Sequence, residues 1–336
     1  MTVVVDVTPA YNILLGREDE IAASVRSSID HFAALRPILA DTVARLVDSD
    51  LSRSNIFRLL PFPIMGSLSQ ESDSVLPIVV ASRIWWTGAE VFDDLADGQY
   101  DSTTGAMTAA QASVGSAACL TAVPLSVLDH ELIPSHLKES WTREMVDSAL
   151  DAAEGQLADL STGATPISWS AVMKSYAGKS GAPYGRDAAM TAQLAGVDDE
   201  AIRGWRNFGR LFGVLRQLAN DRNSQSAGVD VDLTNGTRTA LLAHAVETLA
   251  GTGEANRLAM LHRRAQQDVA AQDELREYLE DTGISHSYNS RVHTMFRRLC
   301  ALLDHLAPPS DDKNLMRWML EISVEDSLLR SKESTA

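Results

Sequence analysis

Three aspartates lie within one short segment of the chain, residues 90–97 (EVFDDLAD). The flanking sequence predicts a helix here, so Asp93 and Asp97 share one face one turn apart and Asp94 lies beside them. Ionised carboxylates this close repel one another unless a cation lies between them. Hard oxygen ligands suit Mg²⁺, which usually shares its coordination with substrate phosphates. The segment therefore predicts a magnesium site, although Asp97 followed by Gly98 is also a common way to end a helix in solvent.

A second polar group lies downstream in residues 215–224 (LRQLANDRNS). Asn220 and Ser224 are four residues apart, so on a helix both side-chain oxygens face the same way and can bind one cation. Asp221 adds a carboxylate beside them. The polar end of a core helix explains the same residues equally well.

Between these two groups the chain reads YAGKSGAPYGR, residues 176–186. Lys179 and Ser180 offer a cation and a hydroxyl to an anionic group, and Pro183 would free backbone carbonyls by kinking the helix. An irregular helix without a ligand is the alternative interpretation of this segment.

The rest of the sequence predicts an all-α protein with a single domain over residues 1–336. The 336 residues are 45% hydrophobic and 22% charged, which is enough to bury a large core. Strand-like alternation is scarce, and helical periodicity dominates. We expect helices over 20–47, 137–160, 199–219, 239–249, 254–281 and 290–306, separated by segments rich in Gly and Pro.

The charge and the remaining motifs exclude several classes of partner. A net charge of −16 and a pI near 4.9 argue against nucleic acid and against an anionic membrane surface. We find no uninterrupted apolar run long enough to span a bilayer and no secretory signal, so we expect a cytoplasmic protein without stable membrane insertion. Cys119 and Cys300 are expected to be buried hydrophobes, and the histidines show no metal-ligand spacing.

Taken in order, these motifs resemble the all-trans polyprenyl diphosphate synthase family from about Leu35 to Leu242. Residues 93–97 are similar to its first aspartate-rich motif and residues 217–224 to its second. Gln156 corresponds to the Gly-Gln pair that faces the substrate, and Lys179-Ser180 to the Lys-Thr pair that holds the allylic diphosphate. The resemblance implies the class I isoprenoid synthase bundle around a deep apolar cavity, Mg²⁺ as cofactor, a prenyl diphosphate substrate and a homodimer.

The chain also departs from the family pattern. Ala33 and Ala34 stand where a chain-elongating member has the Lys and Arg that grip isopentenyl diphosphate, and residues 99–105 (QYDSTTG) replace an Arg-Arg-Gly. Each lost charge-assisted hydrogen bond removes roughly 1.5 to 3 kcal/mol. The second motif has the Asn and Ser of a terpene cyclase metal triad, but Gly228 stands at the third position.

From these departures we infer a class I terpene synthase that ionises one C20 or C15 allylic diphosphate to a hydrocarbon or alcohol. Mg²⁺ is expected to be bound by two sets of ligands: Asp93, Asp94 and Asp97, and then Asn220, Asp221 and Ser224. Lys179 and Ser180 bind the diphosphate, Gln156 faces the substrate, and Gln217 acts at the rim. The carbocation needs a dry, partly aromatic wall, for which the candidates are Trp85, Trp86, Phe92, Tyr176 and Phe212.

Chain length is expected to depend on Gly88 and Ala89, which are small, and on Trp85 as the floor about one turn deeper. The main alternative is a prenyltransferase, either a chain-elongating polyprenyl diphosphate synthase or an enzyme that passes the prenyl group to an aromatic or a peptide tryptophan. A third possibility is a non-catalytic partner subunit, against which the intact set of three aspartates argues.

Overall fold

A computed structural model describes residues 7–51, 55–69, 72–102, 107–129, 133–160, 168–223, 225–226, 229–230 and 239–329. The chain falls into two compact units. The first unit comprises residues 1–149, 186–206 and 306–316, and the second comprises 150–185, 207–305 and 317–336. The single domain over 1–336 stays a prediction.

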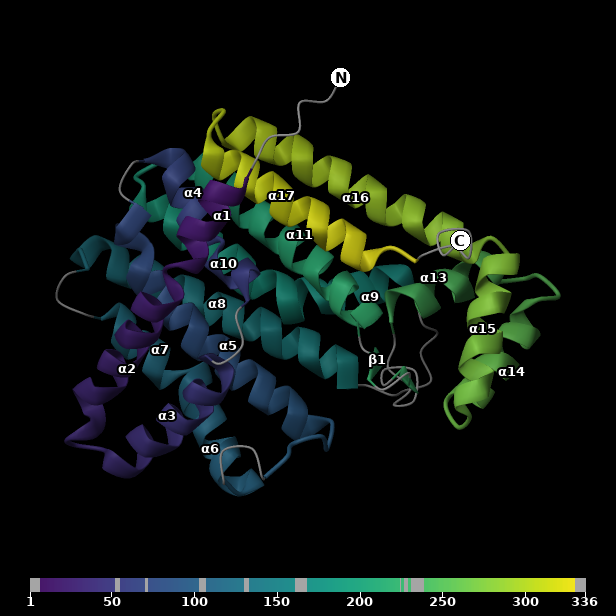
Figure 1. The fold of residues 1–336 in the computed structure, drawn as a ribbon, viewed down its shortest axis with the longest axis horizontal. Helices are drawn as coiled ribbons and strands as arrows, with labels where there is room; N and C mark the ends of the chain where they lie inside the picture. Colours follow the sequence, from purple (N-terminus) through teal and green to yellow (C-terminus); the bar gives the residue numbers. More distant parts are fainter. Residues whose placement is uncertain are drawn as a thin grey trace. The chain divides into compact units, whose positions relative to one another are not determined.

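The prediction of an all-α protein is confirmed, and the described part of the chain is almost entirely helical (Figure 1). The elements that lie wholly in the first unit are α1 (Thr8–Leu15), α2 (Glu18–Ala33), α3 (Pro37–Leu51), η1 (Ile56–Leu59), α4 (Pro61–Leu68), η2 (Ser72–Val75), α5 (Leu76–Ala96), α6 (Ala109–Leu120) and α7 (Ala122–Leu128).

The second unit contains α9 (Trp169–Tyr176), the π-helical turn η3 (Ala177–Gly181), α13 (Ala240–Leu249), α14 (Ala255–Ala265) and α15 (Val269–Asp281). It also contains two antiparallel strands of two residues each, β1 (Gln225–Ser226) and β2 (Val229–Asp230). Residues of both units belong to α8 (Ser135–Leu160), α10 (Ala182–Leu194), α11 (Asp199–Asn223), α16 (Ile284–Leu306) and α17 (Asp311–Ser327).

Helix α5 is the apolar axis of the first unit and packs against α6 and α7. Pro77 is in its first turn, where the missing N–H costs nothing. Its buried residues include Ile78, Val79 and Ile84. The helix ends because Asp97 caps it and Gly98 adopts a φ of 69°, which favours glycine.

In the second unit, glycines let three helical segments approach backbone to backbone. A Cβ on Gly155 of α8 would lie 2.4 Å from the backbone nitrogen of Lys179, and one on Gly213 of α11 would lie 2.4 Å from the carbonyl oxygen of Ser180. No real Cβ tolerates such a distance, so glycine is required at both positions. The turn η3, which contains Lys179 and Ser180, is therefore held between α8 and α11.

A separate apolar cluster joins α13, α14, α15 and the start of α16 within the second unit, where α14 and α15 lie side by side (Figure 1). Leu258 and Leu261 of α14 pack with Leu275 and Tyr278 of α15. Asp268 caps α15 by accepting a hydrogen bond from the backbone N–H of Ala270 at 3.0 Å. Of these two helices, α15 lines a pocket of the second unit with Arg276, Leu279 and Glu280.

Most of the expected helices are present, with different ends. The run expected over 20–47 is two helices, because residues 34–36 interrupt the helix and Pro37 begins α3. The run expected over 254–281 is also two helices, α14 and α15, which Asp268 separates by acting as an N-cap. Helix α16 starts at Ile284 rather than near 290, directly after Gly283 with a φ of 72°.

Two stretches of the described chain, Asp73–Ala96 and Ala109–Leu128, are long and apolar enough to cross a membrane by length and composition alone. Polar or charged residues interrupt both stretches, so they do not contradict the expectation that no uninterrupted apolar run is long enough to span a bilayer. The structure buries 61% of the most apolar window in the first stretch and 44% in the second, and a core helix of a water-soluble protein meets the same criterion. A cytoplasmic protein without membrane insertion stays a prediction.

Candidate active site

The first aspartate-rich segment forms the last turn of α5 and its cap, in the first unit. Asp93 is half-buried, and Asp94 and Asp97 are exposed. The Asp93 carbonyl accepts the Asp97 N–H at 2.9 Å, so helical geometry continues through the cap. Within the described residues, no three Asp, Glu, His or Cys side chains are grouped closely enough to hold a metal ion. Two carboxylates still fit Mg²⁺, which protein sites often bind through one or two carboxylates and substrate phosphates.

Behind these aspartates, a charged cluster that is buried except at Glu90 fixes the preceding turns of α5. Arg58 of η1 donates to Asp50 of α3 at 2.9 Å and also to Glu90 of α5. The Thr87 hydroxyl donates to the second Asp50 oxygen at 3.1 Å, and Arg83 Nη2 lies 3.8 Å from that oxygen. The sequence interpretation missed this cluster because its members come from three elements. It connects α5 to α3 directly before the aspartates.

The residues expected to set chain length differ in their surroundings. Gly88 is buried against α6, where a Cβ would lie 2.8 Å from the Cβ of Cys119. Ala89 is half-buried. The buried ring of Trp85 has the Arg186 guanidinium over one face, 5.0 Å from the ring centroid. Phe92 is 45% exposed, one residue before Asp93.

The lysine motif lies in the second unit, in the π-helical turn η3. Such turns are rare inside α-helices and often occur at functional sites. The Lys179 ammonium donates to the Asp159 carboxylate of α8 at 2.9 Å, and both side chains are mostly buried. Asp159 was not singled out from the sequence, because its partner is twenty residues away and only the packing of α8 on η3 brings the two together. Gln156 is half-buried one turn before it.

A chain of hydrogen bonds runs from the lysine motif to the second acidic motif. The Ser180 hydroxyl donates to Gln217 Oε1 at 2.6 Å, and Gln217 Nε2 donates to Asp221 Oδ1 at 3.2 Å. The Tyr176 hydroxyl donates to the other oxygen of Asp221. The backbone N–H of Ala240, the first residue of α13, donates to the Tyr176 oxygen at 3.2 Å. The structure thus brings together four residues that the sequence suggested separately.

Burial and charge keep the Tyr176 hydroxyl protonated. Burial raises the pKa of Tyr176 well above its ordinary value, and the neighbouring Asp221 carboxylate raises it further. Tyr176 therefore stays a neutral donor to Asp221. Burial also raises the pKa of Tyr288, again with a contribution from Asp221.

The other predicted site residues have mixed positions. Asn220 is exposed near the end of α11, while Phe212 is fully buried on the same helix and packs edge-to-face on Tyr184, with ring centroids 5.2 Å apart. Ser224 and Gly228 lie outside the described residues. Asp93, Asp94 and Asp97 belong to the first unit, and Lys179, Gln217 and Asp221 to the second. The assignment of these residues to one site stays a prediction.

These helices have the all-α fold of class I isoprenoid synthases, and the sequence match names the family. The chain belongs to the polyprenyl synthetase family, whose model matches residues 33–280. The match includes both acidic motifs, Lys179 and Gln217. A search of curated proteins finds no match to the sequence.

Solved structures support the fold. The chain is 18% identical to a geranylgeranyl pyrophosphate synthetase from Pyrococcus horikoshii, with a TM-score of 0.73 over 96% of this chain and 100% of that one. A polyprenyl synthetase from Streptomyces coelicolor gives 18% identity and a TM-score of 0.76 over 95% and 99%. A geranylgeranyl pyrophosphate synthase from Corynebacterium glutamicum, complexed with isoprenyl diphosphate and magnesium, gives 18% and 0.72 over 92% and 99%.

The inference of a terpene cyclase is wrong, because the family model that matches residues 33–280 is that of polyprenyl synthetases. That inference gave most weight to Ala33, Ala34 and Asn220. Losing a few cations weakens the binding of one anion, but it does not create the chemistry of a cyclase. The prenyltransferase alternative agrees better with the comparisons.

Proposed function

We propose that this protein is a prenyltransferase that lengthens an allylic prenyl diphosphate by condensing it with isopentenyl diphosphate. The C1–O bond of the allylic substrate breaks, a C–C bond forms to the terminal alkene carbon of the acceptor, and a proton leaves the acceptor. The products are a longer prenyl diphosphate and free diphosphate. The observation that carries this proposal is the family match over residues 33–280, which includes both acidic motifs and the lysine motif.

The residues of the second unit support a role in holding the leaving diphosphate. The Lys179 ammonium is 22% exposed and paired with Asp159, so it can exchange that partner for a diphosphate oxygen without leaving the turn η3. The chain from Ser180 through Gln217 to Asp221 fixes the neighbouring polar side chains. A preorganised set of polar groups of this kind needs little rearrangement of the protein when the C1–O bond breaks.

Asp93 and Asp94 at the end of α5 are the proposed Mg²⁺ ligands, together with Asn220 of the second motif. When bound, Mg²⁺ would neutralise the charge that develops on the departing diphosphate. The cluster of Arg58 and Asp50 holds the preceding turns of α5 in place. We propose that the protein acts in the cytoplasm as a homodimer. Light scattering on the purified protein measures its molar mass and so tests the dimer.

The alternative is transfer of the prenyl group to an acceptor other than isopentenyl diphosphate, and one observation favours it. Ala33 ends α2 half-buried and Ala34 is exposed, so neither position offers a cation to the diphosphate of isopentenyl diphosphate. A neutral acceptor such as an aromatic ring or a tryptophan side chain needs no such cation. The donor side of the reaction is the same in both cases.

The deciding experiment supplies C10, C15 and C20 allylic diphosphates with Mg²⁺, each with radiolabelled isopentenyl diphosphate, with tryptophan, or alone. We expect label in a prenyl diphosphate at least five carbons longer than the substrate. Prenylated tryptophan, with no labelled prenyl diphosphate formed, would instead support transfer to a non-isoprenoid acceptor. Equal consumption of the allylic diphosphate with no acceptor added would contradict both versions.

A further inference from the structure

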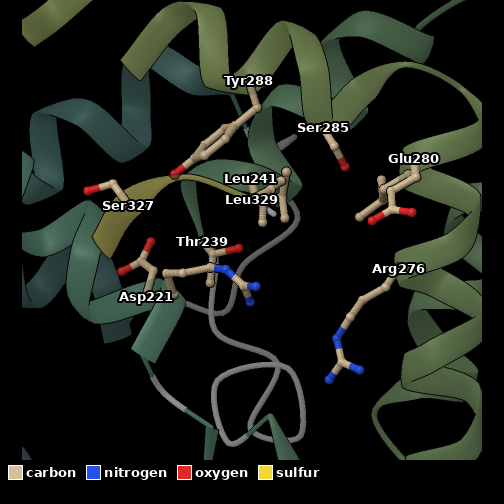
Figure 2. A pocket seen from close by; sticks show the side chains of 11 residues that line it. Asp221, Thr239, Leu241, Arg276, Glu280, Ser285, Tyr288, Ser327 and Leu329 are labelled. Carbon is tan, nitrogen blue, oxygen red and sulfur yellow. The ribbon is translucent and has the colours of Figure 1, made fainter. Parts of the chain in front are cut away.

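The second unit contains a pocket of about 160 Å³ that the proposed reaction does not use (Figure 2). Its walls come from the end of α11, the starts of α13 and α16, one face of α15, and the end of α17 with the residues after it. It shares Asp221 with the hydrogen-bond chain described above, but neither Lys179 nor Gln217 lines it. Ligand pockets for organic cofactors usually measure about 300 to 1,000 Å³, so this one suits an ion of a few atoms and is too small for a prenyl chain.

Two guanidinium groups line this pocket, from Arg222 of α11 and Arg276 of α15. Arg276 Nη1 pairs with Asp273 of its own helix, while Arg276 Nη2 is buried with no hydrogen-bond partner among the described residues. An unsatisfied buried donor on a charged group is costly and calls for a ligand or an ordered water. Two arginines around one small cavity favour an oxyanion, because guanidinium geometry matches its oxygens.

The acidic groups of the pocket narrow the choice of oxyanion. Figure 2 shows Arg276 and Glu280 extending from α15 on one side, with Asp221 on the opposite side. Asp221 already accepts hydrogen bonds from Tyr176 and Gln217. Glu280 can only accept, so it repels a fully ionised anion but accepts from one that keeps a proton. Hydrogen phosphate has such a P–OH group near neutral pH, and sulfate has none.

We propose that this pocket is a binding site for a protonated phosphate group, held by Arg222 and Arg276 and selected by Glu280. Hydroxyl groups of Ser285 and Tyr288 line the same cavity and can donate to the remaining oxygens. The bound ion joins the last turn of α11 to α15, so it stabilises the turn that contains Asp221. This inference goes beyond the proposed reaction and does not depend on it.

Calorimetric titration of the full chain with inorganic phosphate, without Mg²⁺ and at constant ionic strength, tests the site. We expect saturable binding with a Kd on the order of 1 mM or tighter. Sulfate should bind at least about tenfold more weakly, because Glu280 repels it. Equal binding of sulfate and phosphate, or no saturable binding of phosphate, would overturn the proposal.

Variants separate this pocket from the candidate active site. Arg276→Gln should weaken phosphate binding about tenfold or more, as loss of a charge-assisted contact does, while Arg263→Gln, an exposed arginine on α14, should leave it unchanged. Glu280→Gln should raise sulfate binding toward that of phosphate, which keeps the test decisive if Arg276→Gln fails to fold. Phosphate binding unchanged in Glu280→Gln with sulfate still excluded would refute the role of the carboxylate.

Free diphosphate is a second source of the same chemistry, and a third variant distinguishes the two. Lys179→Gln should weaken diphosphate binding at the candidate active site and leave inorganic phosphate binding unchanged. If Lys179→Gln abolishes phosphate binding while Arg276→Gln retains it, phosphate binds at the candidate active site and not in the proposed pocket. Because no turnover is measured, failure of the condensation reaction leaves this result unaffected.

Discussion

At the scale of single residues, most of the predicted chemistry depends on charged groups that already have protein partners. Lys179 is paired with Asp159, and Asp221 accepts hydrogen bonds from Tyr176 and Gln217. A diphosphate must therefore replace a contact at Lys179. At the end of α5, Asp93 and Asp94 differ from each other in exposure, since Asp93 is half-buried and Asp94 is exposed.

The first prediction concerns these two aspartates. Asp94→Ala should abolish Mg²⁺-dependent release of diphosphate, because it removes a hard oxygen ligand, and chelation of the metal should do the same. The fold should remain, since the Asp94 side chain is exposed. Assays of diphosphate release, with circular dichroism for the fold, provide the measurement, and Asp101→Ala, another exposed aspartate, is the control. Full turnover of Asp94→Ala would remove this residue from the metal site.

A second prediction concerns Tyr176 as a positioning residue. Tyr176→Phe removes the hydroxyl that donates to Asp221, and a hydrogen bond to a charged group contributes about 2 kcal/mol. We expect turnover to fall about tenfold or more, together with a higher Mg²⁺ requirement if the second acidic motif binds metal. A loss of stability with an unchanged Mg²⁺ dependence would show that Tyr176 serves the fold alone. Tyr278→Phe, whose hydroxyl contacts Glu254, is the matched control.

At the scale of elements, the end of α5 contrasts two neighbouring small residues. Gly88→Phe should destabilise the protein by about 3 kcal/mol or more, because even a Cβ there lies 2.8 Å from Cys119. Ala89→Phe should fold, because Ala89 is only half-buried. If Ala89 faces the substrate, that variant makes shorter products than the wild type. Urea unfolding and chromatography of the products measure both effects, and an unchanged product length in Ala89→Phe would exclude Ala89 from the pocket.

The approach of α11 to η3 provides a second test at this scale. Gly213→Ala places a Cβ 2.4 Å from the carbonyl oxygen of Ser180, and the backbone on both sides must shift. We expect a loss of about 2 kcal/mol in the free energy of unfolding and weaker binding of diphosphate, since Lys179 lies in the displaced turn. Gly253→Ala, which has open space around it, should change neither. Unaltered diphosphate binding in Gly213→Ala would show that η3 does not position the lysine.

At the scale of the whole molecule, stability should depend on pH through a buried histidine. Burial lowers the pKa of His244 below its ordinary value of 6.5, and the nearby Arg291 lowers it further. The unfolded chain then binds more protons than the folded one at acidic pH. The free energy of unfolding therefore falls as the pH falls from about 6.5 toward the pKa of the folded state, and this group makes it no longer depend on pH above about 6.5. Urea midpoints at several pH values measure this loss. It should be smaller in His244→Gln and unchanged in His305→Gln, which alters an exposed side chain.

How far the sequence reached is clearest from particular residues. Periodicity predicted most helices of the chain, because amphipathic patterning is a local property. It failed at Pro37 and at Asp268, where one helix was expected and two are present. The motifs, taken in order, identified the family correctly. The departures at Ala33 and Ala34 were then given too much weight, because a few substitutions say little about which reaction remains.

The sequence alone determined the fold class, the positions of the acidic and lysine motifs and the family. These features follow from spacing along the chain, and helical geometry converts spacing into faces. Tertiary structure alone decided which groups meet: Asp159 with Lys179, Tyr176 with Asp221, Arg58 with Glu90, and Arg276 with the pocket beside it. The paired side chains are 20 to 45 residues apart. Such pairs depend on how closely two helices approach, which glycines such as Gly155 and Gly213 permit and no linear pattern reveals.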